Sequence, residues 1–486
     1  MPNGAEIHDV VIAGGGPTGM MLAAELRLRG VDVVVLERER ERSPLVRSLG
    51  LHPRSVEILD QRGLLDRFLA LGRRYPDGVG RFAGIVPPRP VELDSDHAYL
   101  LGIPQTSTDR LLEEHAVEQG AQVLRGAELT GVEQEDDVVT IVRADGAVLR
   151  SRWLVGCDGG RSLVRRLLGV GFPGEAARTE WLLGEVEVTM PAEEVAALSE
   201  EVRRTHRGFG IGPAADGLFR AVVPAATVAE DRTVPPTLDE FRAQLRAYAG
   251  TDFGARSPRA LSRFTDATRL ADRYRVGRVL LAGDAAHVHP PLGGQGLNLG
   301  LQDAFNLGWK LAAQLDGRAP EGLLDSYETE RRPVAEQVLT LTRAQSVLID
   351  PEPGPQAVRR LLTDLMEIDG VGHYLAEQVS GLGIRYDLGD GPALLGRRLR
   401  DLPLRDASGR EQRLFERLRD GRGLLLDRTG ALTVAGWADR VGVVADASLP
   451  IEEPAVLLRP DGYVAWIGDG QAGLAGSLRR WFGDAA

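Results

Sequence analysis

The sequence predicts an α/β fold in which a parallel sheet with a nucleotide-binding turn is interrupted by antiparallel strands and followed by a smaller α/β unit. The N-terminus has a strand, glycine turn, helix and strand, residues 175–264 alternate in polarity, and strand-like and helix-like pieces alternate after residue 395. The 486 residues exceed what one core normally organises, so we expect two to four units.

The N-terminal unit has the order of a dinucleotide-binding site. An apolar run (9–13) leads into the turn Gly-Gly-Gly-Pro-Thr-Gly (14–19), and a helix (20–29) and a second strand ending at Glu37 follow. The glycines of a GxGxxG turn allow a tight turn, close approach to a pyrophosphate and packing of helix on strand. The acid is placed to hold a ribose hydroxyl pair, which favours FAD or NAD over a phosphorylated ribose.

A second strand-end site lies between residues 278 and 298. An apolar strand (279–282) is followed by Asp284 and by a Pro/Gly turn that enters a helix near Gly294. The acid can accept hydrogen bonds from ligand hydroxyls, and the free amides at a helix start suit a negative ligand atom. The alternative is a turn whose glycines serve geometry alone.

A third segment repeats this pattern. The apolar stretch 153–157 ends in Asp158, and Ser162 and Arg165 follow on a helical turn. Taken singly, these side chains could form a capped helix start with a salt bridge. Three such strand ends in one chain indicate a common function.

The motifs GxGxxG, DGxxSxxR and GDxxHxxxPxxGxGxN occur here in that order, and the chain resembles the class A flavin-dependent aromatic monooxygenases over its whole length. The resemblance implies a Rossmann-like FAD-binding domain (1–174 and 272–394), an inserted antiparallel-sheet substrate domain (175–271) and a C-terminal thioredoxin-like domain (395–486). The last domain has no CxxC pair, because Cys157 is the only cysteine, so we expect it to be structural.

The resemblance also implies a set of residues that contact FAD. Arg47 and Gln105 are plausible on chemistry too, as a cation and an amide able to reach a pyrophosphate. The implied FAD contacts are Gly14, Gly16, Thr18, Gly19, Glu37, Arg38, Arg47, Gln105, Leu129, Asp284, Leu297 and Asn298.

The reaction implied by the resemblance is oxygenation of an electron-rich aromatic ring through a flavin C4a-hydroperoxide, with O₂ and NADPH as co-substrates. A single GxGxxG turn leaves NADPH to bind transiently. Since the flavin carries the difficult chemistry, we expect no catalytic side chain, no Ser/His/Asp triad and no metal. His287 and His289 lack a third ligand nearby and are expected to be structural.

Within the family, stretches such as 183–190 and 296–310 are most similar to the rifampicin monooxygenases of antibiotic-resistant actinobacteria. This likeness implies oxygenation of the naphthohydroquinone core of a rifamycin, which inactivates the drug. Arg203 and Arg220 match drug-contacting positions, and Pro291 matches a proline beside the substrate and the flavin edge. An arginine can stabilise an ionised naphthol. The alternative is that both arginines are solvated.

Two other functions stay open at this point. One is hydroxylation of an aromatic polyketide of anthracycline or angucycline type in biosynthesis, because those enzymes share the cofactor motifs. The other is a flavoprotein redox sensor that oxygenates nothing.

Composition narrows the possible partners and the expected location of the protein. With 58 basic and 70 acidic residues the net charge is −12, so we expect no nucleic acid partner. No apolar run approaches the roughly 20 residues of a membrane span, and the N-terminus leads directly into a strand. We therefore expect a cytoplasmic monomer or homodimer. A surface hairpin near Tyr75–Tyr99 and two long helices (299–315 and 327–348), the second interrupted at Pro333, complete the predicted elements.

Overall fold

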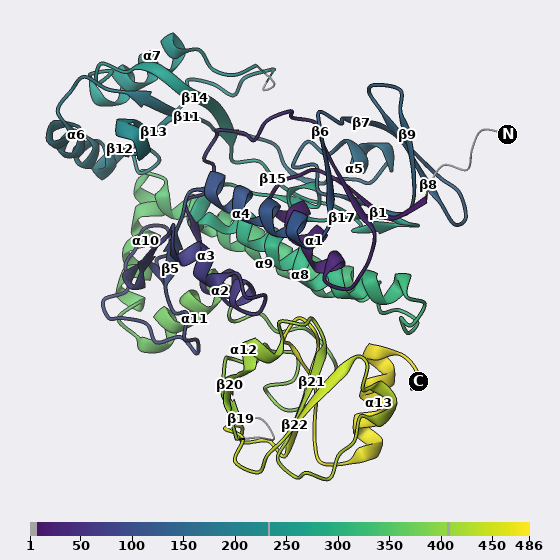
Figure 1. The fold of residues 1–486 in the computed structure, drawn as a ribbon. Coiled ribbons are helices and arrows are strands. Elements are labelled where there is room, and N and C mark those ends of the chain that lie inside the picture. The colour runs from purple at the N-terminus through teal and green to yellow at the C-terminus, as the bar shows by residue number, and fades with distance from the viewer. Residues whose placement is uncertain (1–6, 232–233, 406–408) are drawn as a thin grey trace.

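The nucleotide-binding region is built on a mostly parallel sheet. The computed structural model describes residues 7–231, 234–405 and 409–486 (Figure 1). Along the sheet the strand order is β16-β17-β9-β1-β2-β6, and all neighbours are parallel except β16 and β17. These strands are β1 (Ile7–Ala13), β2 (Val33–Glu37), β6 (Gln122–Arg125), β9 (Val148–Gly156), β16 (Arg275–Val276) and β17 (Val279–Leu281). The carboxyl ends of β1, β9 and β17 carry the three sequence motifs, so the parallel order brings the motifs to one edge.

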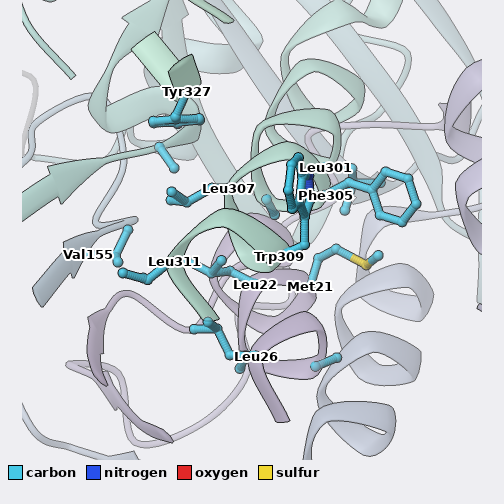
Figure 2. Packing of buried hydrophobic residues seen from close by; sticks show 14 of the residues in the cluster. Met21, Leu22, Leu26, Val155, Leu301, Phe305, Leu307, Trp309, Leu311 and Tyr327 are labelled. Carbon is cyan, nitrogen blue, oxygen red and sulfur yellow. The ribbon is translucent and has the colours of Figure 1, made fainter. Parts of the chain in front are cut away.

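Two helices pack together beside this sheet. They are α1 (Pro17–Arg27) and α8 (Gln295–Leu315), and both are almost entirely buried. Figure 2 shows Met21 and Leu22 of α1 close to Phe305 and Leu311 of α8. Each large apolar side chain buried in this way contributes about 1.5–3 kcal/mol. This contact fixes the first and third motifs relative to each other.

Further elements surround the core. The hairpin β7 (Leu129–Gln134) and β8 (Val139–Arg143) extends β9, and β3 (Gly50–Leu51), β5 (Leu100–Gly102) and β4 (Arg73–Tyr75) form a small sheet. The helices of this region are α2 (Pro53–Asp60), α3 (Leu65–Leu69), α4 (Gln105–Glu118), α5 (Leu163–Leu167), α9 (Ser326–Ile349), α10 (Pro353–Leu365) and α11 (Asp369–Ser380).

The prediction that Pro333 interrupts its helix is wrong, because α9 runs through it. A proline inside a helix removes one backbone donor and clashes with the preceding turn. Here Arg331 and Val334 are buried on either side of the proline, and this packing keeps the helix continuous.

The middle of the chain forms a separate antiparallel sheet, in the order β12-β13-β11-β14. Its strands are β11 (Glu180–Glu187), β12 (Gly210–Pro213), β13 (Phe219–Pro224) and β14 (Arg256–Thr265), and its helices are α6 (Ala192–Thr205) and α7 (Leu238–Ala249). The helices and sheet enclose their own core around Phe241 and Phe253. Three short strands, β10 (Gly174–Glu175), β15 (Thr268–Leu270) and β18 (His287–Val288), join this part to the nucleotide-binding part, so the predicted domain boundaries remain a proposal.

The C-terminal part is a thioredoxin-like α/β unit (Figure 1, yellow-green to yellow). Its sheet has the order β22-β21-β23-β24, with only β21 and β22 parallel. The elements are β19 (Pro403–Arg405), β20 (Glu411–Arg413), α12 (Leu414–Arg417), β21 (Gly423–Asp427), β22 (Val441–Ala445), β23 (Ala455–Leu458), β24 (Val464–Ile467) and α13 (Gln471–Phe482).

A buried ion pair joins this unit to the nucleotide-binding region. In the turn after β23, fully buried Arg459 contacts Glu330 of α9 at 2.6 Å, and Arg54 of α2 donates to the Asp461 carbonyl at 2.9 Å.

No helix in the described ranges is both long and apolar enough to cross a membrane.

Candidate functional site

The first glycine turn has the geometry that a bound pyrophosphate requires. A Cβ on Gly14 would lie 2.3 Å from the Cys157 carbonyl oxygen, and one on Gly19 would lie 2.0 Å from the Gly14 carbonyl oxygen. A Cβ on Gly16 would meet nothing within 4 Å. The outer glycines therefore allow close packing of strand and helix, and the central one leaves open space for a ligand.

Glu37 faces this turn from the end of β2. Its carboxylate accepts hydrogen bonds from the backbone N–H of Gly15 at 2.8 Å and of Glu39 at 2.9 Å. These contacts hold the acid beside the glycine turn, where a ribose would follow the pyrophosphate. Arg38, the next residue, is exposed and forms an ion pair with Glu39.

The third motif lies against the first. A Cβ on Gly283 or on Gly300 would lie only 2.6 or 2.3 Å from the Thr18 hydroxyl, so these glycines allow the two segments to touch. Asp284 follows in a short 3₁₀ turn (Gly283–Ala285), and its side chain is exposed at the start of α8, close to Gly296. A carboxylate in this position is free to accept hydrogen bonds from ligand hydroxyls.

A buried ionic cluster supports the Gly283 turn from behind. Asp303 of α8 accepts hydrogen bonds from the Gly283 N–H at 3.1 Å and from Arg331 Nε at 2.8 Å, and it pairs with His287 Nε2 at 2.7 Å. Burial raises the pKa of the Asp303 carboxyl, but His287 and Arg331 outweigh it and hold the pKa below its usual range. His287 is thus a structural histidine of this cluster.

His289 is held differently, since its Nδ1 contacts the Pro290 carbonyl oxygen at 2.8 Å and burial lowers the pKa of its ring. Among the residues that the structure describes, no three histidine, cysteine or carboxylate side chains gather as a metal site requires.

The second motif forms the capped helix start that its residues suggested, and it also reaches the third motif. Asp158 accepts from the N–H of Leu163 at 2.6 Å, and the Ser162 hydroxyl caps α5. Arg165 donates to the carbonyl of Ala285 at 2.7 Å. This hydrogen bond from Arg165 therefore helps to position the turn that carries Asp284.

The other predicted cofactor residues differ in their surroundings. Arg47 is exposed, Gln105 opens α4, Leu129 opens β7 and is buried, and Leu297 is half-buried in the first turn of α8.

The Asn298 side chain is already engaged by protein. Its Oδ1 accepts from the His52 N–H at 2.8 Å, and its Nδ2 donates to the Gly294 carbonyl at 2.8 Å. A ligand at this position would therefore meet the backbone amides of the helix start, which have no intrahelical partner.

Together these features fit an FAD. The open space at Gly16 suits the pyrophosphate, the acids Glu37 and Asp284 suit ribose and ribityl hydroxyls, and the N-terminus of α8 suits the electron-rich edge of the flavin ring.

A cavity of about 1100 Å³ opens beside the turn that precedes α8. Pro291 and Gly293 line it on the nucleotide-binding side, and Arg203 and Arg207 of the α6 region line it on the other side. Its volume is slightly above the usual range for small-molecule sites, about 300–1,000 Å³, and so has room for a large ligand. Predicted substrate residues Arg203 and Pro291 therefore face the same space.

Arg220 does not line this cavity. It lies on β13, two residues before Val222, which does line it. Its side chain is half-buried, and burial lowers the pKa of its guanidinium while nearby Glu185 opposes that change. Side chains two residues apart on a strand point to the same face, so Arg220 lies on the cavity side of β13, beside the wall that contains Arg203 rather than in it.

An aromatic pair forms part of the cavity wall and was absent from the predicted site. Trp181 on β11 and Phe264 on β14 are cross-strand partners whose rings stack 5.6 Å apart at 10°. Both lay in segments predicted as strands, so the register of those strands was the signal that could have revealed them.

The connection between β4 and β5 also reaches the cavity. The two strands pair as hairpin legs, but Arg81, Ala83 and Gly84 between them line the cavity, and the neighbouring Phe82 is buried. The segment predicted as a surface hairpin thus contributes to the site.

The chain is similar to known proteins along its whole length. Residues 8–342 match a family described as an FAD binding domain, and residues 392–485 match the C-terminal region of aromatic-ring hydroxylases. The chain is 59% identical over 479 residues to a rifampicin monooxygenase from Streptomyces venezuelae, and 58% over 481 residues to one from Rhodococcus hoagii, with 99% of each chain covered. An anhydrotetracycline hydroxylase structure from Streptomyces rimosus superposes with a TM-score of 0.90 at 42% identity, covering 99% of this chain and 100% of that one. The chain therefore belongs to the FAD-binding aromatic-ring hydroxylase family and is a flavin-dependent monooxygenase.

Proposed function

We propose that this enzyme uses NADPH and O₂ to oxygenate the naphthohydroquinone core of rifamycin-type antibiotics and thereby inactivates them. One oxygen atom of O₂ would enter the aromatic substrate, and the other would leave as water with the two electrons of NADPH. The observation that carries the proposal is the large cavity between the Pro291 turn and α6, because it joins the cofactor edge to arginines and a stacked aromatic pair.

The bound FAD supplies the redox and oxygen-transfer chemistry. The chain itself binds and orients. Asp284 accepts hydrogen bonds from the ribityl chain, and Arg165 and Asp303 fix the turn that carries this acid. A turn held in this way would keep the residues that hold the cofactor in one position relative to the cavity wall.

On the substrate side, Arg203 stabilises the ionised naphthol, since a guanidinium next to a phenolate favours the anion and so keeps the ring electron-rich. The Trp181–Phe264 wall supplies apolar surface for the fused rings and excludes water from them. NADPH binds transiently, and the monomeric or homodimeric state and the cytoplasmic location remain predictions.

The nearest alternative is hydroxylation of a tetracyclic or related aromatic polyketide. The close superposition with an anhydrotetracycline hydroxylase favours it, because that enzyme shares the fold of this chain over its whole length.

Both proposals are tested in one assay. Purified FAD-loaded protein is mixed with NADPH, and loss of the reduced nucleotide is followed with rifampicin, with anhydrotetracycline and with no addition, while mass spectrometry detects an added oxygen. We expect rifampicin to accelerate NADPH loss most and to gain one oxygen. A larger effect of anhydrotetracycline would favour the alternative, and no effect of either compound would contradict both and point to a redox sensor.

A further inference from the structure

Gln345 lies at the end of the cavity nearest to the cofactor site. It is on α9, only 2% exposed, and lines the cavity together with Ile349, one helical turn later. It sits between the β4–β5 connection and the turn that leads into α8, since it contacts Ala83 on one side and faces Gly293 on the other.

The orientation of its amide is fixed by a backbone group. The Ala83 N–H donates to Gln345 Oε1 at 3.1 Å. Because a backbone N–H can only donate, the oxygen must face Ala83 and the nitrogen must point elsewhere. Nε2 is buried, and within the described ranges no atom accepts its hydrogen bonds. A buried donor without an acceptor is costly, so a native structure seldom retains one without a function.

Gly293 packs closely against this amide from the turn before α8. A Cβ placed on Gly293 would lie 3.3 Å from Gln345 Nε2 and 3.4 Å from Oε1. A side chain at position 293 would therefore crowd the amide, and both residues line the cavity, Gly293 from an exposed position. Its φ of 69° belongs to a left-handed turn that a larger side chain would strain.

We propose that Gln345 Nε2 donates a hydrogen bond to an oxygen atom of the aromatic substrate at the cofactor end of the cavity. The inference rests on the proposed function and names a binding residue for it. A neutral amide suits a hydroxyl, carbonyl or phenolate oxygen equally well, whereas the arginines of α6 lie at the other wall. Gln345 would thus orient the reacting ring after the arginines have attracted it.

Three variants separate this role from simple support of the loop. Gln345→Met removes both amide atoms. Gln345→Glu keeps an oxygen for the Ala83 N–H but loses the donor towards the substrate. Arg359→Met is the matched control, because Arg359 anchors the same loop by donating to the Ala83 carbonyl at 2.7 Å and does not line the cavity.

Dissociation constants are measured by titrating oxidised, FAD-loaded protein with rifamycin SV and with anhydrotetracycline while the flavin absorbance is followed. We expect both Gln345 variants to raise the substrate Kd by about three- to tenfold with unchanged FAD content. Arg359→Met should leave the Kd unchanged. Substrate binding at the wild-type value in Gln345→Glu, or an equal loss in Arg359→Met and Gln345→Met, would overturn the inference. Failure of both compounds to bind the wild type would also overturn it.

Turnover is measured separately on the wild type. If both compounds bind but neither is oxygenated, the proposed function fails while the Kd series still decides the role of Gln345.

Discussion

The cofactor side and the substrate side of the active region are held in place by different means. On the cofactor side, Asp303 and Arg331 are fully buried and paired with each other, and Asp303 also accepts a hydrogen bond from the Gly283 N–H in the turn that carries Asp284. On the substrate side, Arg203 and Arg207 are exposed on the cavity wall. The cofactor side is therefore built to keep one geometry, and the substrate side is open to changes of ligand.

The largest expected effect comes from breaking the buried cluster. Asp303→Ala leaves the Arg331 charge buried without its carboxylate, and loss of one partner of a buried pair costs about 3–5 kcal/mol. We expect reduced stability and loss of FAD, measured by urea unfolding and by the ratio of flavin to protein.

A surface pair provides the matched control. Asp325, which pairs with Arg275, has a side chain that is 66% exposed, so Asp325→Ala should cost about 0–1 kcal/mol and leave the flavin content intact. Similar losses of stability and flavin in the two variants would show that burial does not increase the contribution of the Asp303 cluster.

Asp284→Ala tests the cofactor side without disturbing its support. The side chain is exposed, so its removal should leave the unfolding free energy almost unchanged. Loss of an acceptor for the ribityl hydroxyls should weaken FAD binding by about tenfold or more and give largely colourless protein. Asp284→Asn, which keeps one acceptor oxygen, should retain more flavin. A full flavin spectrum in Asp284→Ala would remove the residue from the cofactor site.

The cofactor side could be predicted because local rules determine it. Glycines mark the positions where backbone approaches backbone, and β2 ends at Glu37 and α8 begins after Gly294 as the pattern indicates. The support behind the turn could not be found in this way. Asp303 and Arg331 meet His287 only because α8 and α9 pack together, and no local spacing encodes that contact.

The substrate side was harder to predict because packing of distant segments forms it. Its wall combines residues from segments far apart in the chain, such as Arg81, Trp181 and Gln345. Arg203 and Arg220 were equivalent candidates in sequence, and only the fold distinguishes them, since one lines the cavity and the other lies beside it.

That difference gives the next prediction. Arg203→Ala removes a charged donor from the cavity wall, so KM for the aromatic substrate should rise by about tenfold or more, with normal flavin content. Arg220→Ala should raise KM less, because Arg220 lies beside the cavity wall and does not line the cavity. Arg256, exposed and paired with Glu187 outside the cavity, is the control that should change nothing. Steady-state NADPH oxidation measures all three, and an Arg220 effect as large as that of Arg203 would contradict the assignment.

The last prediction concerns the pH dependence of stability and lies at Asp109, which follows Gln105 by one turn of α4. Burial raises the pKa of Asp109 from 3.8 to about 7, although the hydrogen bond from Gln105 and the charge of Arg47 lower it. Between these two pH values the folded protein holds a proton that the unfolded chain has released, so this group makes stability fall as pH rises through that window. Above about pH 7 both states are ionised and the full penalty remains.

Asparagine cannot ionise, so Asp109→Asn isolates this contribution from the other titrating groups. The variant should gain stability relative to the wild type between about pH 4 and pH 7 and keep a constant advantage above it. Thermal unfolding of both FAD-loaded proteins across this range measures the difference. A difference independent of pH would mean that Asp109 is ionised throughout, and Arg47 and Gln105 would then hold a carboxylate beside the predicted pyrophosphate site, which would weaken the case for anion binding there.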